Sequence, residues 1–168
     1  MTGILYPYIP PGKTIMYVGL DNEFMTAAKE FARENNTVQH VGAALVVTNG
    51  RVIGRGSIGA GVHGEQGGCI RERLNVPTGT RYDLCKGCAH EYHSEASAIR
   101  EAKERGEDTR GADLYLWGHW WCCEPCWSAM TEAGIGNVYL LEGSERLFNK
   151  SSPGNVIGRQ FETHYTSR

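Results

Sequence analysis

The sequence predicts an α/β protein, a three-layer α/β/α sandwich in which helices cover both faces of a mixed sheet of about five strands. In the later part of the chain, strand-like and helix-like stretches alternate, which favours parallel strands joined by right-handed crossovers. Before them, two apolar stretches are separated by Asn49-Gly50, a dipeptide typical of a tight hairpin turn. With 168 residues, the chain is long enough for one core and short for two, so we expect a single domain over residues 1–168.

The first predicted element is a helix. Residues 1–19 carry several prolines and glycines, and we expect an irregular leader there. Residues 20–34 then place apolar side chains at helical spacing behind Asp21 or Asn22, either of which can cap a helix. This stretch predicts an amphipathic helix with Phe24 and Phe31 in the core.

The remaining elements follow from the same patterns of apolar residues. They are strands over 41–48 and 51–57, a helix over 93–105, a strand over 113–118, a helix over 123–133 and a strand over 138–141. A long loop, residues 62–92, is inserted between the hairpin and the second helix. The chain ends in a tail, residues 143–168, which we expect to be peripheral.

Composition limits the classes of function. No run of about eighteen apolar residues is present, so no membrane span is expected, and prolines interrupt the start where a secretory signal would lie. The predicted location is therefore the cytoplasm. A net charge of −2 gives no general attraction to duplex nucleic acid. Six cysteines in a chain without an expected export signal favour metal ligands or buried thiols over disulfide bonds, and their clustering favours metal ligands.

One histidine and two closely spaced cysteines predict a metal centre. His93 begins one predicted helix, and Cys123 and Cys126 begin another, with the two sulfurs on one face of its first turn. One His and two Cys suit a tetrahedral Zn²⁺ with one position left for water. Glu95 is close to this centre without being a ligand, which is the arrangement needed to move protons in metal-assisted hydrolysis.

A purely structural zinc is the alternative to a catalytic one. It would need a fourth ligand, such as Cys122 or His119. Glu95 favours the catalytic interpretation, because a carboxylate in that position has no use at a closed structural site.

The inserted loop predicts two further features. Cys69, Cys85 and Cys88, with either His63 or His90 as the fourth ligand, are expected to hold a second, structural zinc. Arginine forms bidentate bonds to phosphate. We therefore expect Arg71 and Arg81 to bind an anionic group of the substrate, with a surface ion pair as the alternative for each.

Beyond the metal motif, whose spacing is typical of zinc nucleobase deaminases, two segments carry a resemblance to a known family. Residues 41–44 read Val-Gly-Ala-Ala, and residues 68–81 contain Gly-Cys-Ile-Arg, a Pro-Thr-Gly turn and a final Arg. Over about residues 20–142 the chain resembles the cytidine and deoxycytidylate deaminase superfamily, and most of all the bacterial deoxycytidylate (dCMP) deaminases.

The resemblance implies a cytidine deaminase-like fold and a metal site of His93, Cys123 and Cys126, with Glu95 as the proton shuttle. It also implies a second zinc and contacts to a 5′-phosphate from the inserted loop. The chain departs from the family at three places. Ser57-Ile58 replaces a Tyr-Asn pair whose Asn binds the sugar, Trp121-Cys122 replaces the Ser/Thr-Pro before the first ligand cysteine, and Gly64 replaces a loop cysteine.

We therefore expect a zinc-dependent enzyme that converts dCMP to dUMP and releases ammonia, with Arg71, Arg81, Ser57 and Trp121 as substrate-binding residues. A homo-oligomer is also expected. Two alternatives remain open. The chain could deaminate another base, free or in single-stranded nucleic acid with Trp120 and Trp121 stacking on it, or it could be a non-catalytic binding module stabilised by zinc.

Overall fold

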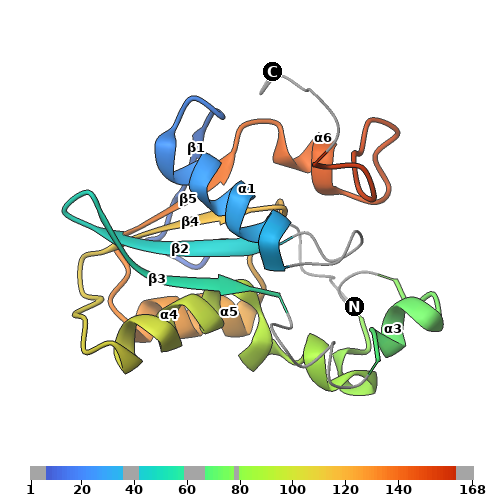
Figure 1. Cartoon of the computed structure of the whole chain (residues 1–168), viewed down its shortest axis with the longest axis horizontal. Helices are drawn as coiled ribbons and strands as arrows, with labels where there is room; N and C mark the ends of the chain where they lie inside the picture. The colour runs from blue at the N-terminus through green and yellow to red at the C-terminus, as the bar shows by residue number, and fades with distance from the viewer. Residues whose placement is uncertain (1–6, 36–41, 59–66, 78–79, 162–168) are drawn as a thin grey trace.

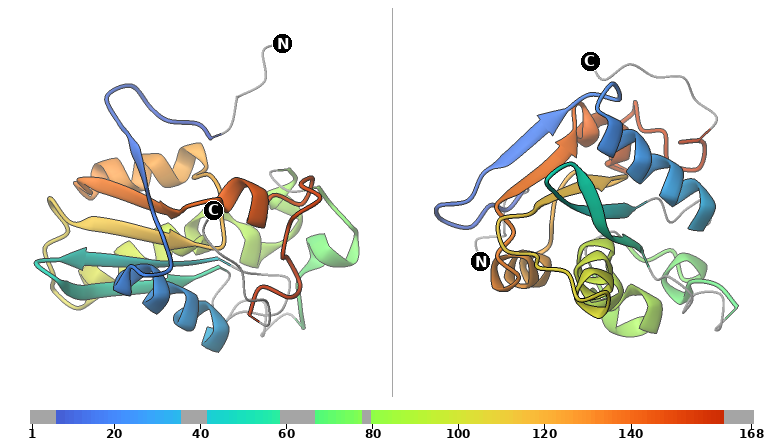
Figure 2. Two further views of the ribbon diagram at one scale, coloured as in Figure 1. Left: turned by 90° about the horizontal axis from the view of Figure 1, so that it is seen from above. Right: turned by 60° about the vertical axis from the view of Figure 1, so that its left-hand side comes forward.

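The computed structural model describes residues 7–35, 42–58, 67–77 and 80–161. Its centre is a five-stranded mixed sheet with the order β1-β5-β4-β2-β3. The strands are β1 (Ile15–Val18), β2 (Ala43–Thr48), β3 (Arg51–Ser57), β4 (Asp113–Trp117) and β5 (Asn137–Leu141). Pairing is antiparallel on both sides of β2 and parallel between β4, β5 and β1. Figure 2 shows β1 and β3 at the two edges. The predicted mixed sheet is confirmed.

Helices lie on both faces of this sheet (Figure 1). On one side lies α1 (Glu23–Asn35), and on the other lie α4 (Ser94–Glu104) and α5 (Glu124–Glu132). The shorter elements are α3 (Ile70–Arg73), α6 (Ser144–Phe148) and the 3-10 turns η1 (Tyr82–Leu84), η2 (Lys86–Cys88) and η3 (His90–Tyr92). The three-layer sandwich predicted from the sequence is therefore confirmed. In the described part of the chain, no helix combines the length and apolar character that crossing a membrane would require.

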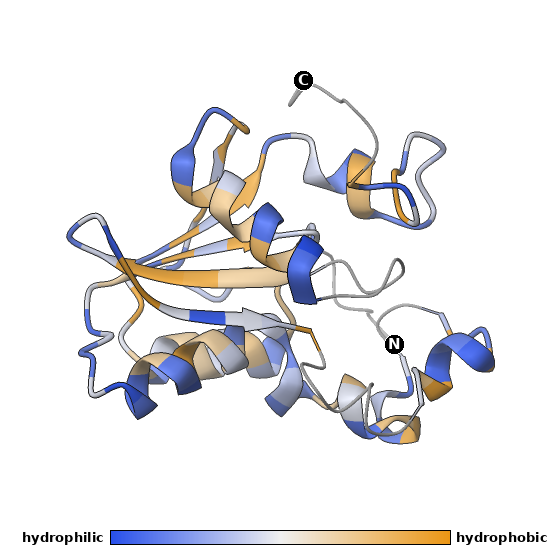
Figure 3. Ribbon diagram, in the orientation of Figure 1, coloured by the Kyte–Doolittle hydropathy of each residue, from blue (hydrophilic) through white to orange (hydrophobic). Residues whose placement is uncertain are grey.

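The alternation of side chains along β2 builds a core on each face of the sheet. Leu45 and Val47 point toward α1 and α6, whereas Ala44 and Val46 pack with residues of α4 and α5. Figure 3 shows β2 in hydrophobic colours in the middle of the molecule and hydrophilic segments on the outer sides of the helices. Both faces of the sheet are therefore buried, as the nearly continuous apolar sequence of β2 requires.

The helix expected over residues 20–34 is α1, and Asn22 caps it. The Asn22 side-chain oxygen accepts hydrogen bonds from the amides of Phe24 and Met25, each at 3.0 Å. The fully buried residues of α1 are Met25, Ala28 and Ala32. Phe24 and Phe31 are only partly buried and pack against that core, so the buried face is centred beside the predicted stripe.

Two expectations about the ends of the chain need correction. The leader is not wholly irregular, because Ile15–Val18 forms the edge strand β1, paired in parallel with β5. The tail is not wholly peripheral either. Leu147 and Phe148 of α6 are buried, and so is Val156 further along, because all three pack into the core beside α1. Short apolar stretches flanked by glycine and proline gave little periodicity from which to recognise either segment.

Candidate metal centre and adjoining cavity

The starts of two helices bring the predicted ligands together. His93 is the N-cap residue of α4, and Cys123 is the N-cap residue of α5. The Nδ1 atom of His93 lies 3.4 Å from the sulfur of Cys123 and 3.4 Å from the sulfur of Cys126. All three ligand atoms lie within 4.8 Å of one another. The grouping expected from the sequence is therefore present in the fold.

A backbone contact sets the orientation of the His93 ring. Its Nε2 atom lies 3.0 Å from the carbonyl oxygen of Cys88, and a carbonyl can only accept, so Nε2 is the atom that carries hydrogen. Nδ1 then presents its lone pair toward the two sulfurs. A hydrogen bond from the second ring nitrogen is the usual means of fixing a metal-binding histidine.

Glu95 lies against the same group of ligands. Its side chain is only 4% exposed. The Cys126 sulfur donates a hydrogen bond to Glu95 Oε2 over 3.3 Å. The carboxylate also lines a small cavity together with His93 and Cys123. A proton acceptor thus faces the cavity next to the ligand group without belonging to it.

The donor set fits zinc with one open position. His, Cys and Cys provide three of four tetrahedral ligands. The neighbouring side chain of Cys126, and after it that of His93, lower the pKa of the Cys123 thiol to about 5, so this ligand is readily available as thiolate. Within the described residues, neither Cys122 nor His119 joins this group. Cys122 is fully buried in the apolar core, and that burial raises its pKa.

The second cluster predicted in the loop is also assembled. The sulfurs of Cys69, Cys85 and Cys88 lie within 4.8 Å of one another, and all three residues are buried. The Cys69 and Cys88 sulfurs are 3.5 Å apart. His90 is exposed and does not belong to the group, whereas His63 lies outside the described residues. The donors fit a thiolate-rich structural zinc, for which the fourth ligand stays a prediction.

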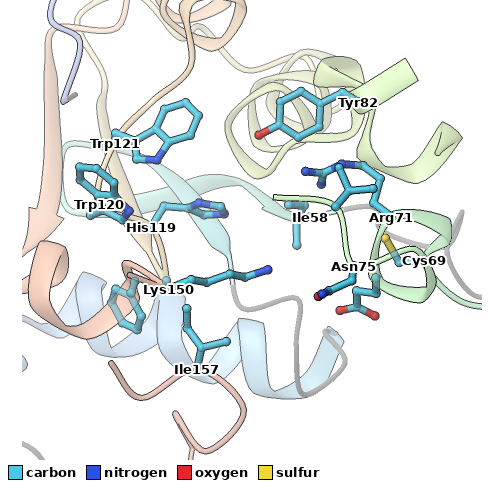
Figure 4. Close-up of a pocket in the computed structure, with 14 residues that line it drawn as sticks. Ile58, Cys69, Arg71, Asn75, Tyr82, His119, Trp120, Trp121, Lys150 and Ile157 are labelled. Carbon is cyan, nitrogen blue, oxygen red and sulfur yellow. The ribbon is translucent and has the colours of Figure 1, made fainter. Parts of the chain in front are cut away.

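A larger cavity continues outward from the metal centre (Figure 4). The two cavities share four lining residues: Ile58, Tyr82, His119 and Trp121. At the outer end lie Arg71 and Asn75 on one wall and Lys150 on the other. Burial lowers the pKa of His119 to about 4, so its imidazole is neutral at pH 7. A ligand could therefore extend from the metal centre to a charged outer end.

The four predicted substrate-binding residues differ in where they lie. Trp121 lines both cavities and Arg71 lines the outer one. Ser57 is buried in β3, and it is its neighbour Ile58 that lines the cavities. Arg81 lines neither cavity, and its exposed side chain pairs with Asp83 at 2.9 Å.

Arg71 has a second task in the loop. Its guanidinium donates to the carbonyls of Thr80 and Pro77 at 3.0 and 2.8 Å. It also lies over the ring of Tyr82, 4.5 Å from the centroid. Tyr82 in turn meets the His93 ring edge to face, with centroids 5.2 Å apart. Arg71 thus connects the inserted loop to the metal centre through one aromatic ring.

Sequence reasoning missed Tyr82, Lys150 and the cavity role of His119. Each stands alone in the sequence, without a motif that indicates a site. Only the fold shows that the inserted loop, the strand ends and the tail meet at one cavity.

A model of the cytidine and deoxycytidylate deaminase zinc-binding region matches residues 19–142. Among solved structures, the dCMP deaminase of cyanophage S-TIM5 in complex with dCMP and dUMP is 20% identical, with a TM-score of 0.48, over 79% of this chain and 83% of that one. The guanine deaminase of Bacillus subtilis is 20% identical, with a TM-score of 0.41, over 73% of this chain and 67% of that one. No protein of curated function matches the sequence.

Proposed function

The chain belongs to the cytidine and deoxycytidylate deaminase zinc-binding family, and we propose that it catalyses the hydrolytic deamination of a cytosine nucleotide, dCMP to dUMP, with release of ammonia. The observation that carries the proposal is the placement of Glu95. This buried carboxylate lines a cavity beside three ligands that leave a zinc ion one open position. A closed structural site would have neither the cavity nor the carboxylate.

His93, Cys123 and Cys126 would hold the zinc ion, which supplies activation of a water molecule by lowering its pKa. Glu95 takes a proton from the attacking water and passes it to the ring nitrogen N3, while the water oxygen bonds to C4. Glu95 then carries the second proton to the exocyclic amine. The C4–N bond breaks, ammonia leaves and the ring becomes uracil.

The walls of the inner cavity suit a flat base. Trp121 and Tyr82 present aromatic surface, and Ile58 adds an apolar contact at the junction of the two cavities. The His93 hydrogen bond to the Cys88 carbonyl keeps the ligand ring in place during proton transfer. The cations at the outer end support a phosphorylated substrate over a free nucleoside.

The proposal includes a second, structural zinc at Cys69, Cys85 and Cys88, a single domain, a cytoplasmic location and a homo-oligomer. The net charge of −2 supports a small nucleotide over duplex nucleic acid.

Ammonia release across cytosine, guanine and adenine nucleosides and their 5′-monophosphates tests the proposal, with Glu95→Gln as the variant. The amide keeps the shape but cannot accept the proton, so we expect zinc to stay bound while turnover falls by about 10² to 10⁴. Ser128→Ala is the control variant, because Ser128 is exposed on α5, and we expect this variant to retain its activity.

Three outcomes would contradict the proposal in different ways. Activity of Glu95→Gln within about tenfold of the parent would remove the proton-shuttle role. Ammonia from a purine, or salt-sensitive binding of single-stranded oligonucleotide, would indicate another base as the substrate. A zinc-loaded parent that releases no ammonia from any compound would indicate a binding module.

A further inference from the structure

The outer cavity is closed by a part of the chain that the family match does not include. That match ends at residue 142. Phe148, Lys150 and Ile157 all follow it, and all three line the outer cavity. Figure 4 shows Lys150 and Ile157 on the side opposite Arg71 and Asn75. One wall of the outer cavity is therefore formed by the tail, beyond the residues of the family match.

The backbone around Lys150 is well anchored. Leu147 and Phe148, directly before it, are buried in the core. The Val156 amide donates to the Leu147 carbonyl at 2.8 Å, which closes the segment into a compact loop. Within that loop, the Asn155 side chain donates to the Ser152 carbonyl at 2.8 Å. A side chain on such a loop starts from a fixed Cα position at the wall of the cavity.

The Lys150 side chain extends into the cavity from the wall that carries His119, and its ammonium points across toward Ile58 and Asn75 (Figure 4). In the described part of the chain, no carboxylate forms an ion pair with it. Arg71 on the opposite wall already donates to two carbonyls and to the sulfur of Cys88. Lys150 is therefore the cation with most capacity left for a ligand.

One negative group opposes this arrangement. Glu72 also lines the outer cavity, and a carboxylate repels phosphate. The two cations outnumber it, so the end of the cavity carries one net positive charge. Two cations and one carboxylate suit a phosphate beside a group that donates hydrogen bonds, such as a sugar hydroxyl.

From these observations we infer that Lys150 pairs with the 5′-phosphate of the substrate and makes the enzyme select a nucleoside monophosphate over the nucleoside. The inference rests on the proposed function for the position of the base at the metal centre. It assigns phosphate recognition to the tail, whereas the sequence had suggested Arg71 and Arg81.

Binding measurements with the reaction product test the inference without turnover. Titration calorimetry of the zinc-loaded protein would compare dUMP with deoxyuridine, and dGMP with deoxyguanosine, for the parent, Lys150→Ala and Lys150→Arg. Lys103→Ala is the matched control, because Lys103 is exposed on α4 and lines neither cavity. Zinc content and the circular dichroism spectrum establish that each variant is folded.

We expect Lys150→Ala to weaken dUMP binding by about tenfold to a hundredfold, the usual range for a lost charge-assisted hydrogen bond, and deoxyuridine binding by less than about twofold. Lys150→Arg should recover most of the affinity, and Lys103→Ala should resemble the parent. Equal losses for nucleotide and nucleoside would overturn the inference. So would a parent that binds neither monophosphate more tightly than its nucleoside.

The proposed function can fail separately. If dGMP binding depends on Lys150 while no cytosine nucleotide releases ammonia, the phosphate role stands and the proposed substrate is wrong. If dCMP is deaminated but the affinity for dUMP does not depend on Lys150, the reaction stands and the inference is overturned.

Discussion

Substitution of Gly56 by alanine should disturb the metal centre through the packing of one helix. Gly56 lies in β3, beneath the first turns of α4. A Cβ atom there would overlap the carbonyl oxygen of Ser94 and the amide nitrogen of Ala98, and would lie 2.7 Å from the Cβ of Ser97. Two of these atoms belong to the backbone of α4, so no side-chain rotation relieves the overlap. The helix itself must move.

The magnitude follows from two opposing effects. Overpacking of a close-packed interface costs about 1 to 3 kcal/mol. Alanine for glycine in a strand returns up to about 1 kcal/mol by reducing the entropy of the unfolded chain. Overpacking is the larger effect, and a net loss of about 1 to 2 kcal/mol lowers the Tm of a chain of this size by about 2 to 8 °C.

The same movement reaches the ligands. His93 caps α4 and Glu95 lies in its first turn, whereas Cys123 and Cys126 belong to α5. A shift of α4 away from β3 therefore moves the side chains of His93 and Glu95 relative to the two cysteines. Disturbing the support of a metal ligand typically costs about tenfold to a hundredfold in metal affinity, and we expect a loss of zinc affinity in that range.

Scanning calorimetry gives the Tm, and competition with a chromogenic chelator gives the zinc affinity. Gly136→Ala is the matched control, because the nearest atom to its Cβ would be 3.5 Å away, an ordinary contact, and its backbone does not require glycine. If the Gly56→Ala protein has the Tm and the zinc affinity of the parent, the interface between α4 and β3 accommodates the added methyl group. That result would refute the reasoning.

Two further predictions concern the inserted loop. Cys85→Ser should lower the zinc content from about two to about one per chain and make the loop sensitive to protease, because a tetrahedral thiolate site loses a ligand. A parent protein that is fully active with one zinc per chain would exclude the second site. Arg71→Ala should raise KM for the nucleoside as well as for the nucleotide, because Tyr82 loses the guanidinium that holds it against His93. Arg81→Ala should change both KM values by less than about twofold, because the ion pair between Arg81 and Asp83 is exposed. A nucleotide-selective effect of Arg81→Ala in steady-state kinetics would return phosphate binding to that residue.

Most of the fold could be predicted because its elements carry local periodicity. The Asn49-Gly50 turn marked the hairpin of β2 and β3, and the helices α1, α4 and α5 have recognisable starts. The edge strand β1 is only four residues long, with two exposed side chains. Its partner β5 is more than a hundred residues away in sequence. A pairing between segments so far apart has no local signal, which is why the strand was missed.

The grouping of His93, Cys123 and Cys126 was predictable for a related reason. Each group lies within four residues of a helix start, so spacing alone places its side chains on one face. No local sequence pattern identifies the residues that line the outer cavity. Tyr82 comes from η1, Ile58 follows β3 and Lys150 follows α6, and only the packed fold brings these segments together.

In the proposed function, the residues that come from a local motif carry out the chemistry, and those from distant segments select the substrate. The candidate metal centre and Glu95 lie inside the family region, and the proposed function places the reaction there. Lys150 and Ile157 lie beyond it, on a tail whose buried residues anchor it to the α1 side of the sheet. The anchor of the tail packs in the core on the α1 side of the sheet, whereas Cys126 and the buried residues of α4 and α5 pack in the core on the other side. Ile58 lines both cavities with an apolar side chain, so under the proposed function the selectivity for the substrate depends more on the polar groups at the outer end.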